Sequence, residues 1–285
     1  MASVAHVEEW TDDCATIAEI EQALVSLRYR HSHGDEPDLR TSVLTHIAWV
    51  PPKWQRAATE TLAGLAERHP SRTLLLLPQP EADDGLAARV SLECHELPGI
   101  ERHLCNEVIE LRLQGGRSQA PASIVAPLLL PDLPVFLRWR GRPDFGSAAF
   151  GQLVGEVDRL VVDSAEWPDV PAAYAELSAL FEEAAVSDIA WRRTLPWRRA
   201  LARAWPDLPE RLTGPPAETA LVAGWLSARA GVEVERERAD ELPVGGDRPP
   251  SDLLSDELDV FVRDPVYEAA VRAAVLSAPR PADRP

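Results

Sequence analysis

The chain contains little lysine and little cysteine for its 285 residues. Lys53 is the only lysine, which excludes a P-loop or a Schiff-base mechanism that needs a lysine elsewhere. The three cysteines, Cys14, Cys94 and Cys105, are an odd number without the even, close spacing of a secreted disulfide framework. This usage favours reduced thiols and a cytoplasmic location.

Neither a signal peptide nor an uninterrupted membrane-spanning run is expected from the sequence. Its first residues are acidic around Glu8 and Asp12, whereas a signal peptide begins with a basic region followed by an apolar one. The most apolar stretch, residues 120–137, is interrupted by Pro121, Pro127 and Pro131. It therefore predicts a buried helix and a buried strand, with no membrane partner.

Basic residues are outnumbered by acidic ones, 29 against 46, and the formal net charge is -17. Because nucleic-acid-binding proteins carry a basic footprint, this balance argues against DNA or RNA as a partner. The 45% hydrophobic and 26% charged shares are those of a folded globular chain. The composition leaves homo-oligomerisation open.

Alternating strand and helix patterns predict an α/β protein: a layered mixed β-sheet N-terminal domain flanked by helices, followed by a second, helix-rich α+β region. The expected divisions are an N-terminal helix and loop, the sheet domain, the helix-rich domain and a disordered tail, at residues 1–40, 41–168, 169–277 and 278–285. Strands are expected at 41–50, 72–77, 86–97, 108–113, 135–139, 160–162 and, as an edge strand, 232–238. Helices are expected at 12–30, 54–68, 118–130, 150–157, 170–185, 196–205, 217–230 and 265–276, with a linker or long loop over 240–256.

No glycine-rich loop, metal site or nucleophile elbow stands out. The chain has no G-x-G-x-x-G run, so no dinucleotide cofactor is expected. Cys94-His95 with His103 and Cys105 supplies the residue types of a zinc site without its spacing, and a core cysteine with surface histidines is favoured over a metal. Asp163-Ser164 follows a strand without a G-x-S-x-G sequence, which favours a capping role over a catalytic one.

Tryptophan and arginine cluster in two places. These residue types are enriched in protein interfaces, although tryptophan is also common in cores. We therefore predict partner-binding roles for Arg138, Trp139, Arg140, Trp191, Arg192, Trp197 and Arg198. Burial within the chain is the alternative for the tryptophans, and carboxylate pairing within the chain is the alternative for the arginines.

Several strings taken in order resemble the OpcA family, whose members assemble glucose-6-phosphate dehydrogenase. The strings are HPSR at 69–72, SIVAPLLLPDLPVFLRWRG at 123–141, DRLVVDS at 158–164, SDIAWRRTLPWRR at 187–199 and LVAGWL at 221–226. Arg138 departs from the pattern, because family members often have a second tryptophan there. The similarity spans about residues 40–275.

The resemblance implies a non-catalytic, cytoplasmic bacterial protein that binds glucose-6-phosphate dehydrogenase. It would act as an allosteric activator that favours the active oligomer and so supports NADPH supply in the pentose phosphate pathway, without a cofactor or catalytic residues. Two alternatives stay open: a sugar-phosphate-sensing domain that uses Arg72, Arg138 or Arg140, and a hydrolase that uses Asp163 and Ser164. A redox role for Cys94 and Cys105, which could meet across a hairpin, is a separate expectation.

Overall fold

The chain divides into two compact units, residues 1–160 and 161–285. The computed structural model describes residues 4–31, 42–65, 68–96, 103–245 and 248–276. The domain limits expected after residues 40, 168 and 277 stay predictions. The expected disordered tail, 278–285, lies outside the described residues.

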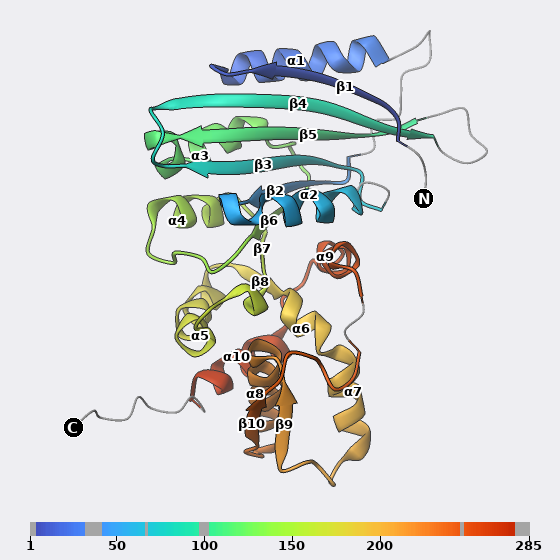
Figure 1. Cartoon of the computed structure of the whole chain (residues 1–285), viewed down its shortest axis with the longest axis vertical. Helices are drawn as coiled ribbons and strands as arrows, with labels where there is room; N and C mark the ends of the chain where they lie inside the picture. Colours follow the sequence, from blue (N-terminus) through green and yellow to red (C-terminus); the bar gives the residue numbers. More distant parts are fainter. Residues whose placement is uncertain (1–3, 32–41, 66–67, 97–102, 246–247, 277–285) are drawn as a thin grey trace. The chain divides into compact units, whose positions relative to one another are not determined.

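A mixed β-sheet forms the centre of the first unit (Figure 1). The strands are β1 (Val4–Asp12), β2 (Leu44–Trp49), β3 (Ser71–Gln79), β4 (Gly85–Glu96), β5 (His103–Gln114), β6 (Val135–Trp139) and β7 (Arg159–Val162). The helices are α1 (Ile17–His31), α2 (Gln55–Ala63), α3 (Ala122–Val125) and α4 (Ala148–Gly155). The order of the eight-stranded sheet is β1-β4-β5-β3-β2-β6-β7-β8, where β8 is Ala185–Asp188 and the unit boundary falls within β7.

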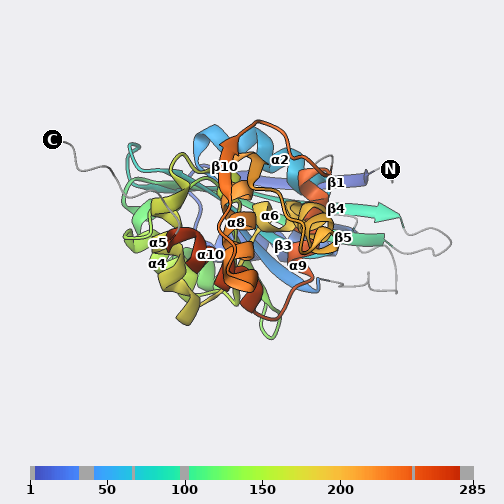
Figure 2. The same ribbon diagram turned by 90° about the horizontal axis from the view of Figure 1, so that it is seen from below.

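Hydrophobic runs determine which strands are central. All of β2 and nearly all of β3 are buried, and β3 pairs in parallel with β2 and β5, as expected for a strand covered on both faces. β4 pairs antiparallel with β5 and with β1, and Figure 2 shows these three strands side by side. The expected α/β class, the buried strand at 72–77 and the antiparallel pairing of 86–97 with 108–113 are confirmed.

The helix α1 illustrates how the sequence sets local structure. Thr16 and Glu19 form a capping box, in which the Thr16 N–H donates to Glu19 Oε2 at 2.8 Å and the Glu19 N–H donates to Thr16 Oγ1 at 3.3 Å. The apolar stripe that includes Ile20, Leu24 and Leu27 is buried, and the helix packs against β4. The predicted N-terminal helix is therefore present, although the strand β1 that precedes it was missed.

The second unit is mainly helical. Its helices are α5 (Val170–Ala179), α6 (Ile189–Arg193), α7 (Leu195–Ala204), α8 (Pro216–Ala230), α9 (Pro250–Leu258) and α10 (Pro265–Leu276). A parallel pair, β9 (Arg211–Gly214) and β10 (Glu235–Arg238), accompanies them and confirms the expected edge strand. α10 packs against α8 and α5 (Figures 1 and 2), and Gly224 permits the close approach, because a Cβ there would lie 2.1 Å from the Ala270 carbonyl oxygen.

Three expected elements differ from the structure in extent or type. The helix over 118–130 is only the short α3 between two 3-10 turns, because Pro121 and Pro127 lack the N–H that a continuous helix requires. The helix over 170–185 ends at Ala179, and its last residue begins β8. The expected linker over 240–256 contains the start of α9, which begins at Pro250 and buries Leu253, Leu254 and Leu258.

Cys94 and Cys105 form a disulfide between directly opposite positions of β4 and β5, with Cα atoms 4.1 Å apart. This pairing corrects the expectation of a reduced core cysteine. Cys14 is an exposed free thiol. Within the described parts of the chain, no His, Cys, Asp and Glu side chains group to suit a metal ion, and no helix is long and apolar enough to cross a membrane.

Candidate functional site

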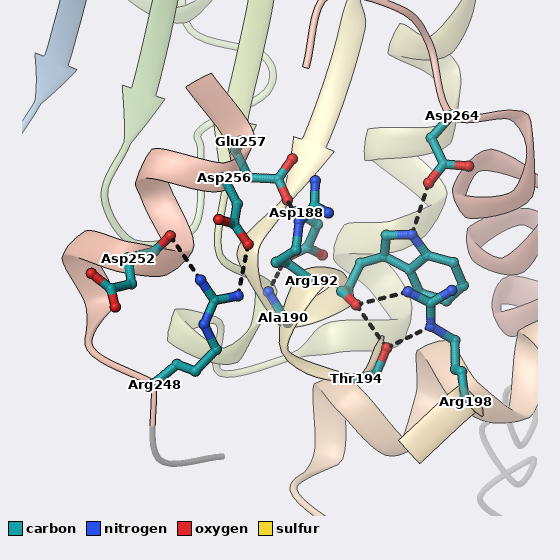
Figure 3. A network of polar contacts seen from close by, with 11 residues as sticks. Asp188, Ala190, Arg192, Thr194, Arg198, Arg248, Asp252, Asp256, Glu257 and Asp264 are labelled. Atoms are coloured by element: carbon teal, nitrogen blue, oxygen red, sulfur yellow. Dashed lines mark hydrogen bonds and ion pairs between the residues drawn. The ribbon is translucent and has the colours of Figure 1, made fainter. Parts of the chain in front are cut away.

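The candidate site is a pocket of about 190 Å³ in the second unit, next to the turn between α6 and α7. Its polar lining comes from the end of β8, from α6 and α7, from α9, and from the start of α10. The polar side chains are those of Ser187, Asp188, Trp191, Arg192, Arg198, Glu257, Asp264 and Tyr267. Figure 3 shows much of this network.

Asp188 caps the N-terminus of α6 and lines the pocket. Its Oδ1 accepts hydrogen bonds from the Ala190 N–H at 2.9 Å and from the Ser164 N–H at 3.0 Å, and its Oδ2 accepts from the Tyr267 hydroxyl at 3.4 Å. Burial, followed by the nearby charge of Asp163, raises the pKa of the Asp188 carboxyl to about 7. This carboxyl therefore changes charge near neutral pH.

Trp191 is held by its indole N–H and by its ring face. Nε1 donates to Asp264 Oδ2 at 2.9 Å, and the Arg198 guanidinium carbon lies 3.4 Å from the ring centroid (Figure 3). Asp264 in turn accepts from the backbone N–H groups of Val266 and Tyr267 through Oδ1. Trp191 is buried, so it supports the pocket and presents Arg198 at its wall.

The two arginines of the pocket differ in their partners. Arg192 donates from Nε to Glu257 Oε1 at 2.6 Å, and its side chain is 26% exposed. Arg198 donates from Nε to Thr194 Oγ1 at 2.9 Å and from Nη2 to the Trp191 carbonyl at 3.3 Å, both of which are neutral acceptors. Burial lowers the pKa of Arg198 to about 10; the charge of Asp264 opposes this shift, and Arg192 and Arg199 add smaller contributions to it.

Trp197 faces another part of the same unit. It packs in a hydrophobic cluster with Leu201, Leu212 and Val222. Of the four residues predicted here, the structure thus brings together Trp191, Arg192 and Arg198, while Trp197 belongs to the core.

The three predicted residues of the first unit lie at the end of β6 and are buried. The Trp139 ring stacks on Trp49 with centroids 4.8 Å apart. Arg138 Nη1 donates to the Trp139 carbonyl, and the Arg140 guanidinium lies 5.3 Å from the ring of Trp54. The partner-binding role of these residues, like that of the second-unit group, stays a prediction.

Arg72, the remaining arginine of the sugar-phosphate alternative, is already engaged within the first unit. It donates from Nε to Glu107 Oε2 and from Nη1 to the Leu128 carbonyl, both at 2.8 Å. Its side chain is buried. This arrangement fixes β3 and β5 to the α3 region.

Asp163 and Ser164 have the capping geometry that was favoured from the sequence. Asp163 Oδ1 accepts from the Ala165 N–H at 3.2 Å, and its Oδ2 accepts from Arg193 at 2.9 Å. Arg193 also pairs with the buried Glu218. The Ser164 hydroxyl lies 2.9 Å from the Tyr174 hydroxyl, so these side chains form a structural network.

Sequence reasoning missed the acidic side of the pocket. Asp188 lay inside a family string, and its position just before α6 is a helix-capping signal that could have identified it. Asp264 immediately precedes the proline that begins α10, which is a similar signal. Glu257 could not be recognised as a pocket residue, because its helix, α9, was not predicted.

Comparisons with known proteins match part of the chain to one family. A family model described as "Glucose-6-phosphate dehydrogenase subunit N-terminal domain" matches residues 63–179, which include β3 to β7. A protein of Synechococcus elongatus whose name contains "OxPP cycle protein OpcA" is 27% identical over 77% of this chain and 48% of its own length. Relatives with the same name from Synechocystis and Nostoc punctiforme are 27% and 28% identical, each over 58% of this chain and over 38% and 39% of their own lengths.

The fold is that of an α/β protein, and the relatives that it matches are named for the OxPP cycle. The chain is similar to the OpcA family over these residues, and the resemblance predicted from its sequence is confirmed. It spans about half the length, or less, of the curated relatives it matches.

Proposed function

We propose that the chain is a non-catalytic, cytoplasmic assembly factor that binds glucose-6-phosphate dehydrogenase and favours its active oligomer. By doing so it supports NADPH supply. The observation that carries the proposal is the match of residues 63–179 to the family model, together with the agreement of three relatives named for the same cycle.

Activation of this kind requires a difference in affinity. A binding partner shifts an equilibrium between oligomeric states only by as much as it prefers one state over the other. A hundredfold shift needs about 2.8 kcal/mol, which one interface of standard size can supply. The chain therefore needs a docking surface but no chemistry of its own.

The predicted partner-binding residues divide into two roles under this proposal. Arg192 and Arg198 are partly exposed and are suited to direct contact. Trp191 and Trp197 are buried and would hold α6 and α7 in position behind them. Arg138, Trp139 and Arg140 would likewise support the end of β6, since they are almost fully buried.

An activity titration tests the proposal. The dehydrogenase from the same source is held at a dilute concentration, and its rate of NADP reduction is measured as the chain is added. We expect the rate to rise and to saturate at a fixed ratio of the two proteins. The chain without dehydrogenase, given glucose 6-phosphate and NADP, is the control and should show no turnover. A rate that is unchanged by a large excess of the chain would contradict the proposal.

The titration is then repeated with Arg192→Gln and Arg198→Gln, with Arg229→Gln as a matched control. Arg229 is an exposed arginine on α8, away from the pocket lining. Direct contact through the pocket predicts a higher half-saturating concentration for the first two variants and an unchanged value for the third.

A further inference from the structure

The hydrogen-bond donors of the pocket are not fully used. A guanidinium has five N–H donors in a planar fork. Within the described parts of the chain, Nη1 of Arg198 has no hydrogen-bond partner and no carboxylate pairs with this side chain. Among the residues that the structure describes, Arg192 pairs through Nε alone, so its terminal nitrogens are also available to a ligand.

The carboxylates around the pocket, by contrast, already accept from the protein. Asp264 accepts from Trp191 Nε1 and from two backbone N–H groups. Asp188 accepts from two backbone N–H groups and from a tyrosine hydroxyl. Glu257 accepts from Arg192. The pocket therefore offers spare donors, and its missing partner is an acceptor.

The position of Arg198 makes this imbalance costly. A partly buried cation whose hydrogen-bond acceptors are neutral loses solvation, and the nearby charge of Asp264 offsets only part of that loss. The lowered pKa of Arg198 reflects that loss, because its largest cause is burial. The stacking on Trp191 fixes the guanidinium plane, so the donors on its edge are pre-organised for two oxygens of one group.

We propose that this pocket binds one oxyanion group, a carboxylate or a phosphate, through Arg198 and Arg192. The volume of about 190 Å³ accommodates one such group with water. It is smaller than the ~300–1,000 Å³ of sites that enclose a whole drug-sized ligand. The group is therefore a free small anion or an acidic side chain presented by a protein partner.

The first test uses the chain alone. Thermal unfolding is followed with increasing inorganic phosphate, and separately with acetate, at constant ionic strength maintained with sodium chloride. We expect at least one of these anions to raise the Tm of the unmodified chain. The Arg198→Gln variant should bind about tenfold more weakly, as expected for the loss of a charge-assisted hydrogen bond.

Arg229→Gln is the matched control, because Arg229 is an exposed arginine of α8, lies outside the pocket lining and is not among the charges that shift the pKa of Arg198. It should respond to anions as the unmodified chain does. Arg192→Gln gives a second reading of the site in case Arg198→Gln does not fold. An equal response of the control and both pocket variants would overturn the site.

The second test identifies an acidic side chain as the source, and it rests on the proposed function. If free anions leave the Tm unchanged, Arg198→Gln should still weaken binding to the dehydrogenase while Arg229→Gln does not. The proposal would be overturned if free anions do not change the Tm and Arg198→Gln does not weaken binding to the dehydrogenase more than the control does. Because the first test contains no dehydrogenase, it can succeed even if the proposed function fails.

Discussion

The buried carboxyl of Asp188 provides a quantitative prediction. Its pKa is about 7 in the folded protein, against 3.8 for an unperturbed aspartate. Because the folded-state pKa is the higher of the two, the protonated form is favoured by folding. The stability from this group is fully present below the unfolded value and is lost as the pH rises through the folded value.

The size of the effect follows from the two pKa values. Each unit of difference corresponds to about 1.36 kcal/mol, so the carboxyl costs on the order of 4 kcal/mol once it is ionised in the folded chain. Between pH 5 and pH 8 the free energy of unfolding falls by about 3 kcal/mol, because part of the ionisation in the unfolded chain occurs below pH 5. Asn at this position keeps an oxygen acceptor for the two N–H groups but cannot ionise.

The assay is urea unfolding of the unmodified chain and of Asp188→Asn at several pH values from 5 to 8. As the pH rises from 5 to 8, we expect the difference in the free energy of unfolding, variant minus unmodified chain, to increase by about 3 kcal/mol. Asp207→Asn, which removes an exposed carboxylate after α7, controls for the change in net charge and should show no such trend. Parallel pH profiles for Asp188→Asn and the unmodified chain would refute the assignment.

Three further stability changes follow from specific contacts. Gly224→Ala should destabilise the chain by about 1–3 kcal/mol in urea unfolding, because its Cβ would overlap the Ala270 carbonyl oxygen of α10; no loss would mean that the helices are not so close. Arg193→Met should cost about 3–5 kcal/mol by the same measurement, because it leaves two buried carboxylates without their cation, and a neutral result would count against that network. Reducing the bond between Cys94 and Cys105, which are separated by 11 residues, should lower stability by about 3 kcal/mol, and an unchanged unfolding midpoint with reductant would contradict this.

Local hydrophobic patterns were enough to predict most of the sheet. The continuous apolar run in β3 predicts a strand buried on both faces. The alternation of apolar and polar residues in β4 predicts a strand buried on one face. α9 was missed because its proline-rich, acidic flanks resemble a linker, and its helical character depends on where Leu253 and Leu258 pack. β1 was missed for a related reason: its charged residues suit an edge strand only when β4 is present to pair with it.

The candidate site was predicted in part. The arginines and Trp191 were identified by residue type, because both types are common at interfaces. Their surroundings could not be predicted, since Glu257 and Asp264 lie far along the chain and reach the pocket only through the packing of α9 and α10. Residue type alone predicted the same partner-binding role for the neighbours Trp197 and Arg198. In the structure, Trp197 lies in the core cluster, whereas Arg198 lines the pocket.

The most direct test of the proposed function is the mass of the dehydrogenase with and without this chain. Sedimentation velocity is measured at a dilution at which the dehydrogenase alone dissociates, and the NADP reduction rate is followed in the same samples. The account predicts that adding the chain produces a larger species containing both proteins, together with a higher rate. A dehydrogenase that sediments unchanged, with an unchanged rate, at saturating concentrations of the chain would contradict it.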